Sequence, residues 1–283
     1  MKKIVVIGSS RDPVIIFYKR FLMRMGIGRG GYCFINSDNF SKGVDVNDEG
    51  WFISGDVAVK HGEVGGVWNR LVMGGGGFIH KSIEVYAMYL MDEVYQGVLN
   101  RPKEGMSNFS KPYQIEKLLL KRLKKIEGYI FSGSMIRADI VGRKLIYKSI
   151  SGVRSIVKKV AKQDRERWVK EPVLFQELIH GDNIRVHVIK DSVIACCCTA
   201  REIDYRYAKA MRIERVNLPL WLKAECIDVA RQMGFGFAGI DLIFRRGEYF
   251  ILEVNPAPGY AYFDIDLCIS RELHKYFEDM MAS

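Results

Sequence analysis

Two acidic side chains and an asparagine near the C-terminus form the set with the clearest chemistry. Asp241 lies within an apolar stretch, and Glu253 and Asn255 end the next one. If the two stretches are antiparallel strands joined at Arg245-Arg246-Gly247, Asp241 and Glu253 fall near cross-strand positions, and Glu253 and Asn255 share a face. Three converging oxygen-bearing side chains suit Mg²⁺ carried by a nucleotide. The alternative is a satisfied core carboxylate followed by an ordinary Asn-Pro turn.

A second set of residues is cationic, and several of its members lie on or beside apolar strands: Lys111, Lys148, Arg185, Arg201 and Arg206. Lys148 ends a hydrophobic stretch and either snorkels at a sheet edge or faces an anion. The turn of small residues after it, Ser149-Ile150-Ser151-Gly152, allows backbone N–H groups to approach phosphates. Gln176-Glu177 is a polar pair inside an apolar strand, which suits backbone contacts to adenine. Together with the carboxylates, these features describe an ATP site.

The elements that must position these residues divide the chain into two parts with different patterns of predicted helices and strands. In the first hundred residues, apolar runs and glycine turns predict strands at 3–7, 32–36, two short ones within 51–60, and 64–68, with helices at 13–25 and 79–98. A turn-rich linker follows at 100–110. These residues read as a small α/β domain.

Beyond the linker the pattern predicts a helix at 111–125 and then mainly short strands. We expect strands at 129–131, 144–150, 154–160, 173–179, 184–189, 192–200, 236–244 and 248–254, with a hairpin turn at Asp191-Ser192. Helices are expected at 219–233 and about 267–280. The fold class is therefore α+β.

The positive charge of the chain is concentrated in one segment. The net charge is +10, and residues 111–170 alone hold 17 basic and 5 acidic residues, a net of +12. This excess indicates an anionic partner: nucleic acid, nucleotide phosphates or an acidic peptide. The alternative for the run Lys121–Lys125 is a solvated helix face.

Composition excludes several classes of protein. With 48% hydrophobic and 27% charged residues in 283, the chain is neither collagen-like, coiled-coil nor disordered. No apolar run approaches the ~18 residues of a membrane span or has the form of a signal peptide, so we expect a cytoplasmic protein with no membrane partner. The six cysteines, three of them adjacent at Cys196-Cys197-Cys198, lack disulfide or zinc spacing and are expected to be reduced core residues.

From Lys111 onward the sequence resembles the ATP-grasp superfamily, in particular the branch of the ribosomal-protein glutamate ligase, glutathione-synthase-like enzymes and microviridin-type peptide-crosslinking ligases. The matching stretches stand in the family's order: 110–114, 146–152, 176–181 followed by 184–186, 204–206, 239–241 and 252–256. Upstream, Val67-Trp68-Asn69-Arg70 and Asn100-Arg101-Pro102 are similar to the N-terminal domain of the peptide-crosslinking ligases.

The resemblance implies a role for each matching residue. Lys111 and Lys148 would contact ATP phosphates, the segment Gln176, Glu177, Leu178 and Ile179 would hold adenine, and Asn183 stands where the family often has an aspartate near the ribose. Arg185 and Arg206 would stabilise charge on the transferring phosphate, and Asp241, Glu253 and Asn255 would hold Mg²⁺. The charged and aromatic stretch with Arg201, Asp204 and Tyr205 is expected at the edge of the substrate site.

The resulting prediction is an ATP-grasp fold with an N-terminal α/β pre-ATP-grasp domain at 1–107 and an ATP-grasp domain at 108–283, divided into subdomains 108–178 and 179–283. We expect an ATP- and Mg²⁺-dependent carboxylate-amine ligase that forms an amide, or an ester with a hydroxyl acceptor, through an acylphosphate on a peptide substrate, which an acidic sequence would suit. A ligase of free amino acids or small metabolites is the nearer alternative. A nucleic-acid-binding module is the alternative from another class, disfavoured because the carboxylate set would have no role. The sequence leaves a homo-oligomer open.

Overall fold

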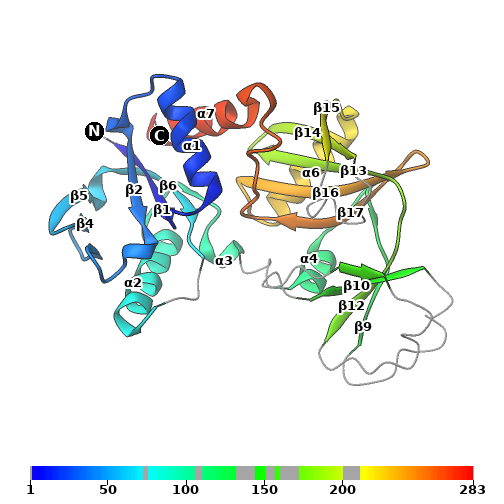
Figure 1. Ribbon diagram of the computed structural model, residues 1–283, viewed down its shortest axis with the longest axis horizontal. Helices are drawn as coiled ribbons and strands as arrows, with labels where there is room; N and C mark the ends of the chain where they lie inside the picture. The colour runs from blue at the N-terminus through cyan, green and yellow to red at the C-terminus, as the bar shows by residue number, and fades with distance from the viewer. Residues whose placement is uncertain are drawn as a thin grey trace.

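The computed structural model describes residues 2–72, 76–105, 110–131, 144–150, 157–159, 172–199 and 211–282. Its N-terminal part is built on a parallel sheet with strand order β2-β1-β6-β7 (Figure 1). These strands are β1 (Lys3–Gly8), β2 (Tyr32–Asn36), β6 (Val64–Arg70) and β7 (Val98–Leu99). An antiparallel sheet of β3 (Val44–Val46), β4 (Gly50–Ile53) and β5 (Asp56–Lys60) adjoins them, with the short helices η1 (Arg29–Gly31), η2 (Ser37–Asn39) and η3 (His61–Glu63) between strands.

Strand β1 is apolar from Ile4 to Ile7 because both faces of the parallel sheet are covered. Ile4 and Val6 pack with helix α1 (Pro13–Arg24). Val5 and Ile7 pack with helix α2 (Phe78–Tyr89) on the opposite face. Helix α1 begins where the sequence indicates, because Asp12 accepts a hydrogen bond from the N–H of Val14 and a proline occupies the first helical position.

The rest of the described chain holds two further sheets, which are antiparallel except that β8 runs parallel to β17. One has the strand order β11-β10-β12-β9, with β9 (Gly128–Phe131), β10 (Leu145–Ser149), β11 (Val157–Lys159) and β12 (Val173–Glu177). The other has the order β15-β14-β13-β16-β17-β8, with β8 (Lys124–Lys125), β13 (Asp182–Ile189), β14 (Ser192–Thr199), β15 (Arg212–Val216), β16 (Phe237–Arg245) and β17 (Glu248–Asn255). We call them the central sheet and the C-terminal sheet. The connecting helices are α3 (Pro102–Gly105), α4 (Lys111–Lys117), α6 (Leu220–Gln232), η8 (Ile265–Leu267) and α7 (Cys268–Ala282).

The two faces of the C-terminal sheet have different neighbours. Val186, Ile240 and Val254 lie on the face that packs against α6, in one apolar cluster with Leu222 and Val229. On the opposite face, the residues nearest the N-terminal part pack with α1 and α7. Since side chains alternate along a strand, Arg185, Asp241 and Glu253 lie on this second face.

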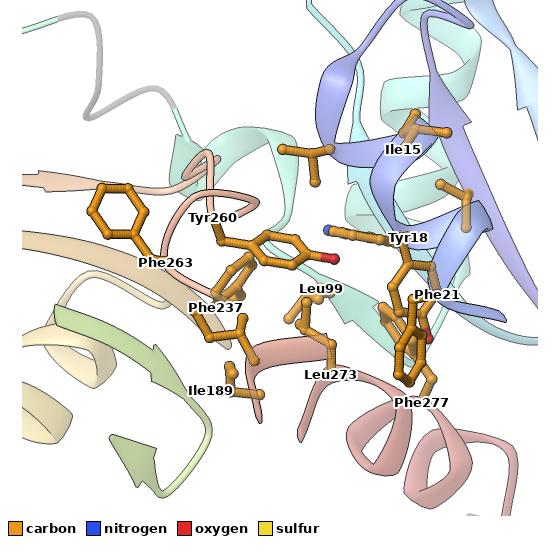
Figure 2. Packing of buried hydrophobic residues seen from close by; sticks show 14 of the residues in the cluster. Ile15, Tyr18, Phe21, Leu99, Ile189, Phe237, Tyr260, Phe263, Leu273 and Phe277 are labelled. Carbon is orange, nitrogen blue, oxygen red and sulfur yellow. The ribbon is translucent and has the colours of Figure 1, made fainter. Parts of the chain in front are cut away.

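An aromatic cluster joins the N-terminal part to the C-terminal sheet. Tyr18 of α1 stacks edge-on against Trp68 of β6, with ring centroids 5.2 Å apart. Tyr260, from the loop after β17, is fully buried and meets Phe237 edge-on at 5.9 Å. In Figure 2 the hydroxyl end of Tyr260 points toward the part of the protein that holds Tyr18, and Leu99, Phe237 and Leu273 pack around Tyr260. The loop after β17 is therefore held by the N-terminal part.

Two predicted helices are too long. The helix expected at 79–98 is α-helical only to Tyr89 and continues as the π-helical turn η4 (Leu90–Val94), because Val98 and Leu99 pair with β6 instead. The guanidinium of Arg101 donates to the carbonyls of Met91, Asp92, Tyr95 and Gln96, so it satisfies acceptors that the end of this helix leaves open.

The helix expected at 111–125 ends at Lys117. The carboxylate of Glu225 accepts hydrogen bonds from the backbone N–H groups of Lys121 (2.7 Å), Arg122 (3.0 Å) and Leu123 (3.0 Å). Those N–H groups therefore cannot donate within a helix. The contact comes from α6, about a hundred residues further along the chain, so local periodicity could not reveal it.

Other predictions stand closer to the structure. The hairpin of β13 and β14 is confirmed, with its turn one residue earlier than expected, since Ile189 already pairs with Ser192. Cys196 and Cys198 are buried free thiols, and burial raises the pKa of Cys196 to about 11 and that of Cys198 to about 12, as for unreactive core residues. Only 157–159 of the expected strand 154–160 is described.

The predicted domain boundary between residues 107 and 108 falls outside the described residues. The division into 1–107 and 108–283, with subdomains 108–178 and 179–283, stays a prediction. Among the helices of the described residues, none is both long and apolar enough to cross a membrane.

The contact between Glu225 and the segment 121–123 generates a stability prediction. Glu225 is buried, so Glu225→Ala leaves three backbone N–H groups without their acceptor and should lower the free energy of unfolding by about 3 kcal/mol. Urea unfolding measures the change. Asp228→Ala is the matched control, because this α6 carboxylate pairs with Lys121 at the surface and its loss should change stability little. Equal effects of the two substitutions would contradict the assignment.

Candidate functional site

One row of side chains across the C-terminal sheet carries most of the predicted chemistry. Arg185 of β13 lies opposite Asp241 of β16, and Asp241 lies opposite Glu253 of β17, so the three side chains share a face. The guanidinium of Arg185 donates to Asp241 Oδ1 at 2.8 Å, and only 6% and 7% of the two side chains are exposed. The expected cross-strand pairing of Asp241 with Glu253 is confirmed by the register of β16 and β17. A bulge follows it between Asp241 and Leu242.

A glycine makes room for the buried guanidinium. Gly239, two residues before Asp241 on the same face, lies so close to Arg185 that a Cβ there would overlap its guanidinium group and approach Pro258 Cβ to 2.7 Å. A side chain at this position would push Arg185 away from Asp241. Gly239 is therefore required by the close packing of the ion pair rather than by its own backbone conformation.

Asn255 occupies the next position on the same face of β17. It lies opposite Gly239, and its Oδ1 accepts a hydrogen bond from the N–H of Ala257 at 2.8 Å. An amide oxygen has a second lone pair available for a cation. Within the described residues no three His, Cys, Asp or Glu side chains could hold a metal by themselves. Two carboxylates and an amide oxygen do fit Mg²⁺, which usually binds one or two carboxylates and completes its shell with phosphates and water.

The two predicted phosphate lysines lie beside the same strand end. Lys111 begins α4, capped by Ser110; its N–H donates to Ile150 O at 3.1 Å and its ammonium to Ser149 O at 3.3 Å. Lys148 is in β10 of the central sheet and is only 8% exposed. Lysines are rarely buried to this degree unless an anionic or polar group compensates them. The structure therefore places both lysines at the β10 end near α4, and the ammonium of Lys111 directly at that strand end.

The predicted adenine segment ends β12 and faces the C-terminal sheet. Gln176 is almost fully buried, and its amide donates to Ile126 O at 3.4 Å. Leu178 leaves the strand with its N–H donating to Lys144 O at 2.7 Å, while Glu177 is exposed. Ile179 packs with Ile126 and with Ile243, which lies on the same face as Asp241. An apolar floor thus runs from the predicted adenine segment toward the row of Arg185 and Asp241.

The remaining predicted residues divide into two groups. Asn183 lies half-buried in β13, opposite Ile243 and two positions from Arg185 on the same face. Arg201, Asp204, Tyr205 and Arg206 lie outside the described residues, so their predicted roles stay predictions. The predicted residues on described strands are Lys148, Gln176 and Glu177 in the central sheet and Asn183, Arg185, Asp241, Glu253 and Asn255 in the C-terminal sheet.

Sequence reasoning missed His187, which lies two residues from Arg185 on the same face. It is fully buried, its ring lies tilted against that of Phe263 with the centroids 5.3 Å apart, and its Nε2 lies 3.3 Å from Gly259 O. Burial, and next the positive charge of Arg185, lower its pKa to about 3, while the contacts with Gly259 and Asp241 act in the opposite direction. The histidine is therefore neutral. Its alternation with Arg185 in Ile184-Arg185-Val186-His187 was the available signal.

The comparisons with known proteins agree with this geometry. Residues 119–259 match the model of the ATP-grasp domain. The chain therefore contains an ATP-grasp domain, and the predicted ATP-grasp fold is confirmed. A sequence search of curated proteins finds no match.

Solved structures of peptide-modifying ligases share the fold over the whole chain. The ATP-grasp ligase PsnB complexed with a minimal precursor is 22% identical, with a TM-score of 0.77 over 99% of this chain and 100% of that one. A RiPP-associated ATP-grasp ligase from Chryseobacterium gregarium, in complex with ADP and a leader and core peptide, is 17% identical, with a TM-score of 0.78 over 99% and 97%. The macrocyclase MdnC of Microcystis aeruginosa MRC, bound with its precursor peptide, is 17% identical, with a TM-score of 0.76 over 99% and 100%.

The neutral state of His187 generates a pH prediction. The unfolded chain takes up this proton near pH 6.5, and the folded protein does so only near about pH 3. The folded state therefore has its full stability with respect to this group above about pH 6.5, and the free energy of unfolding decreases as the pH falls toward 3. His187→Leu should make the loss of stability between about pH 5.5 and 4.5 shallower by about 1.4 kcal/mol per pH unit, the value for one proton. Urea unfolding across this range measures both slopes. Parallel slopes would show that His187 is charged in the folded protein.

Proposed function

We propose that this protein is an ATP- and Mg²⁺-dependent ligase that joins a carboxylate to an amine, or to a hydroxyl, on a peptide substrate. The observation that carries the proposal is the row of buried Arg185, buried Asp241 and half-buried Glu253, which lies on the face that meets the predicted adenine segment. The similarity of the protein's fold to those of PsnB and MdnC supports the same assignment.

The reaction requires two successive displacements and no nucleophile from the protein. A substrate carboxylate oxygen attacks the γ-phosphorus of ATP, which releases ADP and leaves an acylphosphate. The amine then attacks the acyl carbon, phosphate leaves, and the amine loses a proton. A site for this chemistry must hold ATP, substrate and the developing negative charge in one water-poor space.

The described residues suit these tasks. Lys111 and Lys148 would bind phosphate oxygens, and Arg185 would stabilise charge on the transferring phosphoryl group, a part that Arg206 would share. Asp241, Glu253 and Asn255 would hold Mg²⁺, which when bound neutralises charge on the phosphates.

The remaining binding roles follow the same assignment. Gln176, Glu177, Leu178 and Ile179 would hold adenine above the apolar floor, and Asn183 would lie near the ribose. Arg201, Asp204 and Tyr205 are proposed for the substrate edge. ADP and Mg²⁺ in the complexes of PsnB, and ADP in that of the Chryseobacterium ligase, support the cofactors.

A peptide is the substrate class that the comparisons favour. The PsnB, MdnC and Chryseobacterium structures contain precursor, leader or core peptides. An acidic peptide would also suit the net charge of +12 at residues 111–170. Part of that charge is used inside the fold, because Lys121 pairs with Asp228, Lys124 with Glu248, and Arg122 lies 4.0 Å over the ring of Trp221.

The carboxylate role is tested by Glu253→Gln, which removes one charge at the proposed metal site without changing the size of the side chain. Mg²⁺-dependent ADP formation should fall about a hundredfold or more, as when a group that stabilises transition-state charge is removed. Glu248→Gln is the matched control: it is the same change at the exposed start of β17 and should leave the rate unchanged. A Glu253→Gln enzyme with the parental rate would refute the metal assignment.

The substrate class is tested by salt. Attraction between the basic segment and an acidic peptide is screened by ions, so the KM for such a peptide should rise several-fold from about 50 to about 300 mM salt. Steady-state ADP release measures it, with a neutral peptide of equal length as the control. A flat response, or full activity with single amino acids, would instead indicate a small-molecule ligase.

A further inference from the structure

Gln114 is a buried amide that the proposed chemistry does not yet use. It lies in α4, one turn after Lys111, and is only 3% exposed. Its Nε2 donates to Val254 O at 2.7 Å, and its Oε1 accepts from Val254 N at 3.3 Å. Val254 is the residue between Glu253 and Asn255. A side chain from a distant helix thus holds both backbone groups of the residue between two proposed metal-binding side chains.

The hydrogen bonds of Gln114 replace those of a missing strand. One edge of β17 pairs with β16, and the other pairs with β8 only at Phe250 and Ile251. Beyond Ile251 the strand would present unpaired backbone groups at a buried position. The amide of Gln114 offers one donor and one acceptor, the same pair that a neighbouring strand would offer.

A second amide fixes the other side of Asn255. Asn100, at the end of β7 and with φ of +62°, donates to Pro256 O and to Phe237 O, and accepts from Phe237 N at 3.1 Å. Asn255 therefore lies between two restrained neighbours, Val254 and Pro256. Asn100 directly follows β7, whereas Gln114 belongs to α4, which lies between the central and C-terminal sheets in Figure 1.

We propose that Gln114 is a positioning residue for the metal site: it sets the end of β17 so that Glu253 and Asn255 present their oxygens to Mg²⁺ together. The inference rests on the proposed function, because it assumes that these side chains bind the metal. Helix α4 also begins with Lys111, whose contacts are at the end of β10. The same helix therefore links the proposed phosphate-binding lysines to the proposed metal-binding strand.

The test is Gln114→Met, which keeps the length of the side chain and removes both hydrogen bonds. Calorimetric titration measures the affinity for ADP with and without Mg²⁺, and the gain in affinity due to Mg²⁺ is the readout. We expect Gln114→Met to reduce this gain about tenfold or more, the scale typical of groups that orient metal ligands. ADP affinity without Mg²⁺ should stay at the parental value.

Gln232→Met is a closely matched control. Gln232 of α6 makes the same pair of hydrogen bonds, accepting from Leu119 N at 2.7 Å and donating to Leu119 O at 3.1 Å, outside the proposed site. Its loss should leave the Mg²⁺-dependent gain unchanged. If the role of Gln114 is purely structural, Gln114→Met will lower the thermal stability and leave the gain intact, as Gln232→Met does.

The outcomes separate the inference from the proposed function. Three results together would overturn the inference: Mg²⁺ strengthens ADP binding in the parent, Glu253→Gln abolishes this gain in affinity, and Gln114→Met retains it. If the parent itself shows no gain, the proposed function fails first. Should Gln114→Met not fold, Gln114→Ser leaves room for water to satisfy Val254 while releasing its position, and a parental gain in that variant would also overturn the inference.

Discussion

The buried ion pair of Arg185 and Asp241 is the interaction on which the site depends. Two charges in the middle of an apolar sheet are costly to remove from water, and their attraction offsets that cost only in good geometry. The sheet provides this geometry. Arg185 and Asp241 are direct neighbours across β13 and β16, the guanidinium lies 2.8 Å from Asp241 Oδ1, and Gly239 leaves space for the guanidinium. Removal of either partner would leave the other charge buried without this ion pair.

The surrounding packing keeps that pair in a rigid frame. One face of the C-terminal sheet is filled by α6, and the opposite face is apolar near the N-terminal part, where Tyr260 and Leu273 join Tyr18. Neutral His187 belongs to this frame, because its ring fills space between Phe237 and Phe263 and its Nε2 contacts the loop after Asn255.

Positive charge serves two purposes in this protein. At the surface, Lys121 and Lys124 form ion pairs that attach the segment after α4 to the C-terminal sheet and α6. Near the proposed nucleotide, Lys111 and Lys148 are more enclosed, where electrostatic interactions are stronger because water screens them less. A single count of lysine and arginine residues therefore overstates the field available to a partner.

The pairing of Asp241 with Glu253 could be predicted from sequence because it is local: a tight turn, with Arg246 and Gly247 both at positive φ, fixes the register of two consecutive strands. The apolar stretch of β16 and the start of α1 at Pro13 were equally legible. The partner of Asp241 was not, since it depends on which distant strand lies beside β16. Glu225 ends the helix at Lys117, and Gln114 completes the edge of β17, through contacts across more than a hundred residues. Sequence determined the elements with local causes, and tertiary packing decided every feature whose hydrogen-bond partner comes from elsewhere in the chain.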